Sequence, residues 1–129
     1  EGILSVEASI PEITKIIRKE LPRPPAGGFN TLFTHGANGE YGHPRHRGVH
    51  LAVKQMLAEK ELKAKDVFFF SYRLDEKQKI AVPREGAAYQ IELSNKEWQA
   101  KRNVVKKLYG FRPHIFENRS CAKAETFSV

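Results

Sequence analysis

Hydrophobic residues recur at helical spacing in three stretches of the chain. In residues 9–21 a capping-type Ser9 precedes proline and glutamate, and Ile13, Ile16, Ile17 and Leu21 then follow at helical spacing, which predicts a helix. A second helix is expected over residues 44–60, because Pro44 suits a first helical turn. A third is expected over residues 94–110, where Ser94 opens a capping-box pattern. All three should bury one apolar face.

Shorter apolar runs predict strands. Residues 66–72 form a near-continuous apolar run, as is typical of a parallel strand covered on both faces, and residues 29–34 are expected to form a short buried strand. The helix expected at 44–60 lies between them, so the three elements form one βαβ unit. Residues 79–82 and 89–93 predict two further short strands. The pattern indicates an α/β fold with a mainly parallel sheet and flanking helices.

The size of the predicted sheet bears on the domain organisation. At 129 residues the chain fits a single α/β domain, residues 1–129. Two or three parallel strands cannot provide a full core, and the sequence begins at Glu1 without an initiator methionine. We therefore expect the chain to be the C-terminal portion of a larger domain, incomplete at the N-terminus.

Composition excludes little by itself. The net charge is +7, from 22 basic and 15 acidic residues, but basic residues such as Lys101 and Lys106 alternate with core positions on the expected helices. Solvated helix faces are favoured over a nucleic-acid footprint, so no nucleic-acid partner is expected; a basic nucleic-acid-binding module stays open as a third hypothesis. A lone Cys121 indicates a reducing, cytoplasmic setting.

Two expectations concern association. No apolar run approaches the roughly 18 residues that a membrane span requires, so none is expected. An unpaired sheet edge would favour self-association into a homo-oligomer.

Four of the five histidines lie between positions 35 and 50, after the first strand and at the start of the next helix. Ligands of open α/β sheets bind at such strand-to-helix loops. His43 and His46 are three positions apart and can face one cavity, while His46 and His50 have the spacing by which a helix offers two imidazoles to one metal. A catalytic zinc site needs three protein ligands and one open position.

Simpler interpretations remain open at this stage. Asn38 and Gly39 form a common turn pair. His50 is more typical of a packing or surface residue, and His35 is equally suited to loop hydrogen bonding and to lining a site. Spacing alone does not distinguish a ligand role for His46 from chance.

Residues 34–46 read Thr-His-Gly-Ala-Asn-Gly-Glu-Tyr-Gly-His-Pro-Arg-His. This run resembles the second conserved block of the LmbE-like, or PIG-L-like, N-acetylglucosamine deacetylase family. The similarity rests on Glu-Tyr-Gly-His-Pro-x-His directly after an apolar strand that ends in Thr-His. Weaker similarity extends from about Ile10 to the C-terminus.

The resemblance implies a Rossmann-like fold and a zinc-dependent hydrolysis of the acetamide on an acetylated amino-sugar conjugate. His46 would be a zinc ligand. His43 would stabilise the oxyanion or protonate the leaving amine, and Tyr41 would be a mobile phenol near the tetrahedral intermediate. Glu40 and Gly42 are expected to contact the substrate, since Glu40 supplies an acid and glycine lets the backbone approach a ligand closely.

Two departures from the family pattern matter for function. The first family block, His-Pro-Asp-Asp-Glu, supplies two zinc ligands and the general base, and these 129 residues do not contain it. Arg45 stands where many members have aspartate, and arginine disfavours a protonated imidazole beside it. Zinc is thus expected in the full-length protein, whereas this chain alone forms an incomplete site. A non-catalytic, sugar- or protein-binding descendant of the fold is the alternative function.

Overall fold

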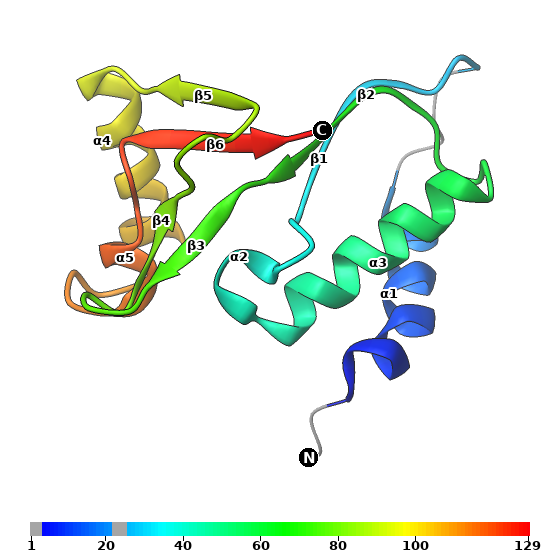
Figure 1. The fold of residues 1–129 in the computed structure, drawn as a ribbon, viewed down its shortest axis with the longest axis horizontal. Helices are drawn as coiled ribbons and strands as arrows, with labels where there is room; N and C mark the ends of the chain where they lie inside the picture. The colour runs from blue at the N-terminus through cyan, green and yellow to red at the C-terminus, as the bar shows by residue number, and fades with distance from the viewer. Residues whose placement is uncertain (1–3, 22–25) are drawn as a thin grey trace. The chain divides into compact units, whose positions relative to one another are not determined.

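In the computed structural model, which describes residues 4–21 and 26–129, the helices and strands fall into two units (Figure 1). The first unit comprises Glu1–Phe70, with Val129, and the second Ser71–Ser128. The elements of the first unit are α1 (Val6–Glu20), β1 (Phe29–Thr34), α2 (Gly39–Gly42), α3 (Pro44–Ala58) and β2 (Ala64–Phe70). Those of the second unit are β3 (Tyr72–Asp75), β4 (Ile80–Pro83), β5 (Tyr89–Glu92), α4 (Asn95–Asn103), η1 (Val104–Leu108), α5 (Phe116–Arg119) and β6 (Ala124–Ser128).

The first unit contains the expected βαβ arrangement. Strands β1 and β2 pair in parallel, in a register that runs from Phe29 opposite Ala64 to Thr34 opposite Phe69. Helix α3 connects them, and α1 lies beside α3 (Figure 1). The small core of this unit is built on Val53, Met56 and Leu62; the partly buried hydrophobic residues around it are Ile17, Phe29, Leu32, Val49 and Leu57.

Helix α1 begins earlier than the sequence pattern predicts. Ser5 is its cap, and the Ser5 hydroxyl accepts a hydrogen bond from the Ala8 N–H at 3.1 Å. Ser9 lies inside the helix, where its Oγ donates to the Val6 carbonyl at 2.6 Å, and Pro11 also lies inside. The prediction that Ser9 caps the helix was therefore wrong. Ser5, four positions earlier, is the cap and accepts a hydrogen bond from an N–H group of the first helical turn.

The strands of the first unit are less buried than their apolar character predicts. In β2, Lys65 and Asp66 are exposed and the residues from Val67 to Phe70 are only partly buried. Phe33 of β1 is 55% exposed and stacks on Phe68, with the ring centroids 5.3 Å apart. The prediction that both faces are covered does not hold within the described residues.

The second unit contains antiparallel pairs, β3 with β4 and β5 with β6. The capping box at Ser94 is confirmed: its Oγ accepts from the Glu97 N–H, and the Glu97 carboxylate accepts from the Ser94 N–H. Helix α4 continues into the wider turn η1, and Gly110 follows with a φ of 73°. Of the pairings within each unit, one is parallel and two are antiparallel, so the fold is mixed α/β rather than mainly parallel.

Candidate metal-binding site

The histidine loop connects β1 to α3 in the first unit. His35 follows Thr34, the last residue of β1, so its position is set by the strand. His43 caps α3, and its Nδ1 accepts a hydrogen bond from the Arg45 N–H at 3.2 Å. His46 then lies in the first turn of α3, with Pro44 at the helix start as expected.

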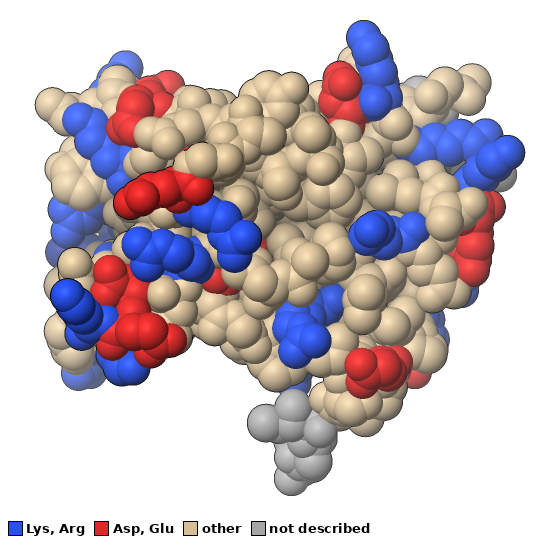
Figure 2. All heavy atoms as spheres, viewed as in Figure 1, with Lys and Arg blue, Asp and Glu red and all other residues tan. Residues whose placement is uncertain are grey.

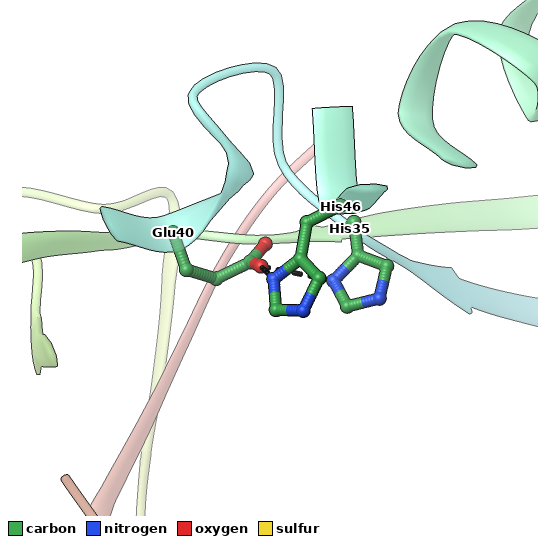
Figure 3. A group of neighbouring side chains, drawn as sticks. All are labelled: His35, Glu40 and His46. Carbon is green, nitrogen blue, oxygen red and sulfur yellow. Dashed lines mark hydrogen bonds and ion pairs between the residues drawn. The ribbon is translucent and has the colours of Figure 1, made fainter. Parts of the chain in front are cut away.

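One carboxylate joins the two ends of this loop. Oε2 of Glu40 lies 2.9 Å from Nδ1 of His35 and 2.5 Å from Nδ1 of His46 (Figure 3). Oε1 of the same carboxylate accepts the Gly36 N–H at 2.8 Å. Glu40 is buried, with only 8% of the residue exposed. One ligand atom from each of the three side chains lies within 4.8 Å of the others, which is a group able to hold a metal ion.

The aromatic rings of the loop contact one another beside the two histidines that bond Glu40. The imidazoles of His35 and His46 stack, with centroids 4.0 Å apart and 15° between their planes. The His43 ring lies 4.5 Å from that of His46. The Tyr41 ring contacts both edge-on, at 5.4 Å from His46 and 5.7 Å from His43. The loop therefore gathers three imidazoles and one phenol at the carboxyl end of β1.

The loop backbone is unusual at its centre. Although α2 is drawn as a helix, Glu40 has φ 62° and ψ −56°, which non-glycine residues rarely adopt. The Asn38 side chain bonds both backbone polar groups of Glu40. The Asn38 Oδ1 accepts a hydrogen bond from the Glu40 N–H, and the Asn38 Nδ2 donates one to the Glu40 carbonyl, both at 3.2 Å. Such strain, costing about 1–3 kcal/mol, persists only where neighbouring groups impose it.

Hydrogen bonding decides the charge of Glu40. Burial acts to raise the pKa of its carboxyl, but hydrogen bonds from His35, His46 and the Gly36 N–H outweigh burial and lower the pKa to about 2. The carboxylate is thus ionised throughout the neutral range. The pKa of His43 is lowered, first by burial and then by the charges of His46 and Arg45. Arg45 thus acts on His43 in the direction expected from the sequence.

The histidines separate into two groups. His35 and His46 belong to the cluster, and His43 lies beside it. His50 is buried elsewhere: its ring packs edge-on against Phe69, and its Nδ1 bonds the His35 carbonyl at 2.9 Å. The helical pair His46 and His50 therefore does not form a joint ligand set, because their side chains have different partners.

Two expectations about the loop are refined. Glu40, expected to contact substrate, is the centre of the cluster, and Gly42 is exposed with a φ of 91°. The sequence did not decide the role of His35, because it lies five positions before Glu40 and eleven before His46, which fits no helix or strand period. The sequence feature that could have indicated the cluster is the carboxylate of Glu40 inside a histidine-rich loop.

The donor types fit several divalent metals. Imidazole nitrogen and carboxylate oxygen are ordinary zinc ligands, but they also suit other first-row metals, so the cluster alone does not select zinc.

Comparisons with family models, with curated proteins and with solved structures found no match for this chain. The resemblance to the deacetylase family therefore stays a prediction that rests on the loop residues.

Charges of both signs lie on the surface. Figure 2 shows Lys and Arg side chains interspersed with Asp and Glu on the face in view. Over residues 4–21 and 26–129, no helix has the length and apolar character needed to cross a membrane.

Proposed function

We propose that this chain forms part of a zinc-dependent hydrolase that removes the N-acetyl group from a glucosamine-containing conjugate. The domain would be a Rossmann-like α/β domain of the LmbE-like, or PIG-L-like, type. The observation that carries the proposal is the cluster of His35, Glu40 and His46 where β1 ends and α3 begins. Open α/β sheets bind their ligands at this edge.

His46 would hold the zinc ion from the first turn of α3. When bound, zinc polarises the acetamide carbonyl and lowers the pKa of a water molecule to about 7. The family block His-Pro-Asp-Asp-Glu, which does not occur in these residues, would supply further ligands and the general base. Glu40 is an unsuitable base, since its two oxygens already accept three hydrogen bonds.

His43 is better suited to stabilising the oxyanion than to protonating the leaving amine. Its lowered pKa favours the neutral imidazole near pH 7. Because its Nδ1 accepts the Arg45 N–H, the proton of the neutral ring resides on Nε2. An N–H donor of this kind can stabilise the negative charge that develops on the amide oxygen.

Tyr41 would be the second group to act on the reacting amide. Its ring contacts the edges of both His43 and His46, so its phenol belongs to the same site. A tyrosine O–H can add a hydrogen bond to a tetrahedral intermediate. Gly42, with its positive φ and exposed surface, leaves the backbone accessible to a sugar substrate.

The test is acetate release from N-acetylglucosaminides by the full-length protein, measured together with its zinc content. We expect His46→Ala to lose zinc and activity together. The matched control is His114→Ala, which removes an exposed histidine from the second unit and should change neither.

Zinc content that is equal in the wild type and His46→Ala would reject the ligand role. A zinc-loaded protein that binds N-acetylglucosamine without releasing acetate would instead favour the non-catalytic descendant.

A further inference from the structure

The second unit contains a small cavity between the helix formed by α4 and η1 and the segment that runs from residue 113 into α5. Its volume is about 160 Å³, which is roughly ten times the smallest volume that holds one water molecule. The residues that line it are Gln99, Arg102, Asn103, Lys106, Pro113 and Asn118. Two of these six are cations, three are amides and none is acidic.

One face of the helix provides the positive side of the cavity. The four lining residues from Gln99 to Lys106 follow one another at helical spacing, so their side chains share that face. The helix widens after Asn103 into η1, where the Tyr109 N–H bonds the Val104 carbonyl at 3.2 Å, five positions back. Such wide turns are frequent at functional sites.

A buried amide lies on the opposite side. Asn118 belongs to α5, which packs against η1, and only 7% of the residue is exposed. Its Nδ2 donates to the Phe111 carbonyl at 3.1 Å, which holds the side chain in place. An amide nitrogen carries two N–H groups, so Asn118 keeps a second donor for a ligand in the cavity.

The two cations of the lining are not neutralised by acidic side chains. Neither Arg102 nor Lys106 forms an ion pair with any residue in the described part of the chain. The Arg102 guanidinium lies over the Trp98 ring, 5.0 Å from its centroid, and this cation–π contact restrains it. Clefts lined by one sign of charge attract the opposite ion, so the cavity favours an anion.

We propose that this cavity binds a phosphoryl group, either as inorganic phosphate or as a phosphate monoester. A monoester carries about −1.5 to −2 charges at pH 7, which matches the two cations. The planar guanidinium of Arg102 can bind two phosphoryl oxygens at once, and Lys106 adds a point charge. A carboxylate has one charge and two oxygens, so it would leave part of this donor set unused.

The site does not depend on the proposed hydrolase. It uses no residue of the histidine loop, and all six lining residues belong to the second unit. Loss of the deacetylase proposal would therefore leave the phosphoryl site unchanged, and the reverse also holds.

The first test is titration of the full chain with inorganic phosphate, methyl phosphate and acetate, each at the same ionic strength. Trp98 is the only tryptophan, so its fluorescence reports on Arg102 above it, and ¹H–¹⁵N NMR follows the Asn118 side-chain amide. We expect saturable changes with the two phosphates and roughly 10-fold weaker binding of acetate. Tighter binding of methyl phosphate would identify a monoester as the ligand, and equal or weaker binding would identify inorganic phosphate.

The second test compares two neighbouring lysines. Lys106→Gln removes a cation that lines the cavity, whereas Lys107→Gln removes an equally exposed cation that does not. Both variants lose the same charge. We expect Lys106→Gln to weaken phosphate binding by roughly 10-fold, as loss of one charge-assisted hydrogen bond does, and Lys107→Gln to bind like the wild type. Arg102→Lys keeps the charge but loses the planar fork, so it should also bind more weakly.

Three results would overturn the proposal. The first is the absence of a saturable phosphate-dependent change at Asn118 in the wild type. The second is acetate binding as tight as phosphate binding. The third is an equal loss of affinity in Lys106→Gln and Lys107→Gln, because it would mean that the net charge of +7 attracts anions without a defined site. Circular dichroism checks that each variant is folded, and the wild-type titration decides the case if a variant unfolds.

Discussion

The Nδ1 atom of His46 lies 2.5 Å from Oε2 of Glu40, six positions earlier in the chain. This contact connects the strained centre of the loop to the first turn of α3. Because the same oxygen also reaches His35 at the end of β1, a single carboxylate links strand, loop and helix. The stability of the loop and the geometry of its imidazoles therefore depend on the same side chain.

The ionisation of Glu40 should make stability depend on pH. Its pKa is lowered on folding from 4.5 to about 2. The resulting stabilisation is fully present above about pH 4.5 and is lost as the pH falls towards 2, because protons then bind the unfolded state first. At neutral pH it amounts to on the order of 3 kcal/mol.

Urea unfolding of the wild type and Glu40→Gln between pH 2 and 7 measures this effect. We expect the variant to be the less stable at pH 7 and the difference to shrink as the solution is acidified. Glu12→Gln, an exposed change on α1, is the control and should give a small difference at every pH. A Glu40 difference that is constant with pH would contradict the ionised carboxylate.

Gly36 is a second sensitive position in the loop. A Cβ at this residue would lie 2.2 Å from the carbonyl oxygen of Phe70, which is backbone of β2 and cannot rotate away. We expect Gly36→Ala to destabilise the protein by about 1–3 kcal/mol, the usual cost of overpacking. It should also weaken metal binding, because the Gly36 N–H is one of the three donors to Glu40.

Thermal unfolding checks this prediction against Gly27→Ala, where no atom lies within 4 Å of an added Cβ. The control should unfold close to the wild-type temperature. If both variants unfold alike, the close approach of Gly36 to Phe70 is absent in solution.

The sequence predicted the elements whose signals are local. The bounds of β1 match the strand expected at 29–34, Pro44 starts α3, and the capping box at Ser94 forms as expected. Each of these depends on residues within one turn or one strand. Helix α1 was misplaced because Ser5 and Ser9 offer competing local signals, and only packing chooses between them.

The remaining elements depend on distant partners. Strand β6 was not expected, and its register with β5 pairs Tyr89 with Phe127, 38 positions further along the chain. In the site, the positions of His43 and His46 at the helix start followed from the sequence. The joint contact of Glu40 with His35 and His46 did not, because it requires a positive φ at Glu40 that no residue pattern indicates.

The packing of α1 on α3 gives a prediction away from the loop. A Cβ added at Gly48 would lie 2.4 Å from Ser9 Oγ and 2.9 Å from Ile13 Cδ1. We expect Gly48→Ala to destabilise the protein by about 1–3 kcal/mol, because the added methyl group would force α1 and α3 apart. This cost should exceed the roughly 1 kcal/mol that alanine gains over glycine in a helix.

A double-mutant cycle with Ser9→Ala tests the contact directly. Without the hydroxyl, the nearest Ser9 atom is Cβ at 3.7 Å, which is ordinary contact, and Ile13 Cδ1 ends a flexible side chain. Gly48→Ala should therefore cost less in the Ser9→Ala background, with a coupling energy of about 0.5–3 kcal/mol by urea unfolding. Additive effects would show that the two helices do not approach here.

The second unit has a polar network whose strength can be compared with a surface pair. Glu125 accepts a hydrogen bond from the Tyr72 hydroxyl and forms an ion pair with Lys101, whose Nζ also donates to the Ala122 carbonyl at 3.0 Å. The Lys101 and Glu125 side chains are only 29% and 21% exposed. Lys101 therefore belongs to a packed network, although the sequence indicated a surface charge.

Removing Glu125 should leave two polar groups with reduced access to water. We expect Glu125→Ala to destabilise the protein by about 1–3 kcal/mol, since an unsatisfied partner costs more than the bond itself contributes. Glu76→Ala is the matched control, because it breaks an ion pair with Lys79 whose side chains are 75% and 70% exposed. Such exposed pairs contribute at most about 1 kcal/mol. Urea unfolding of both variants should give clearly different midpoints, and equal midpoints would mean that water replaces Glu125 as easily as it replaces Glu76.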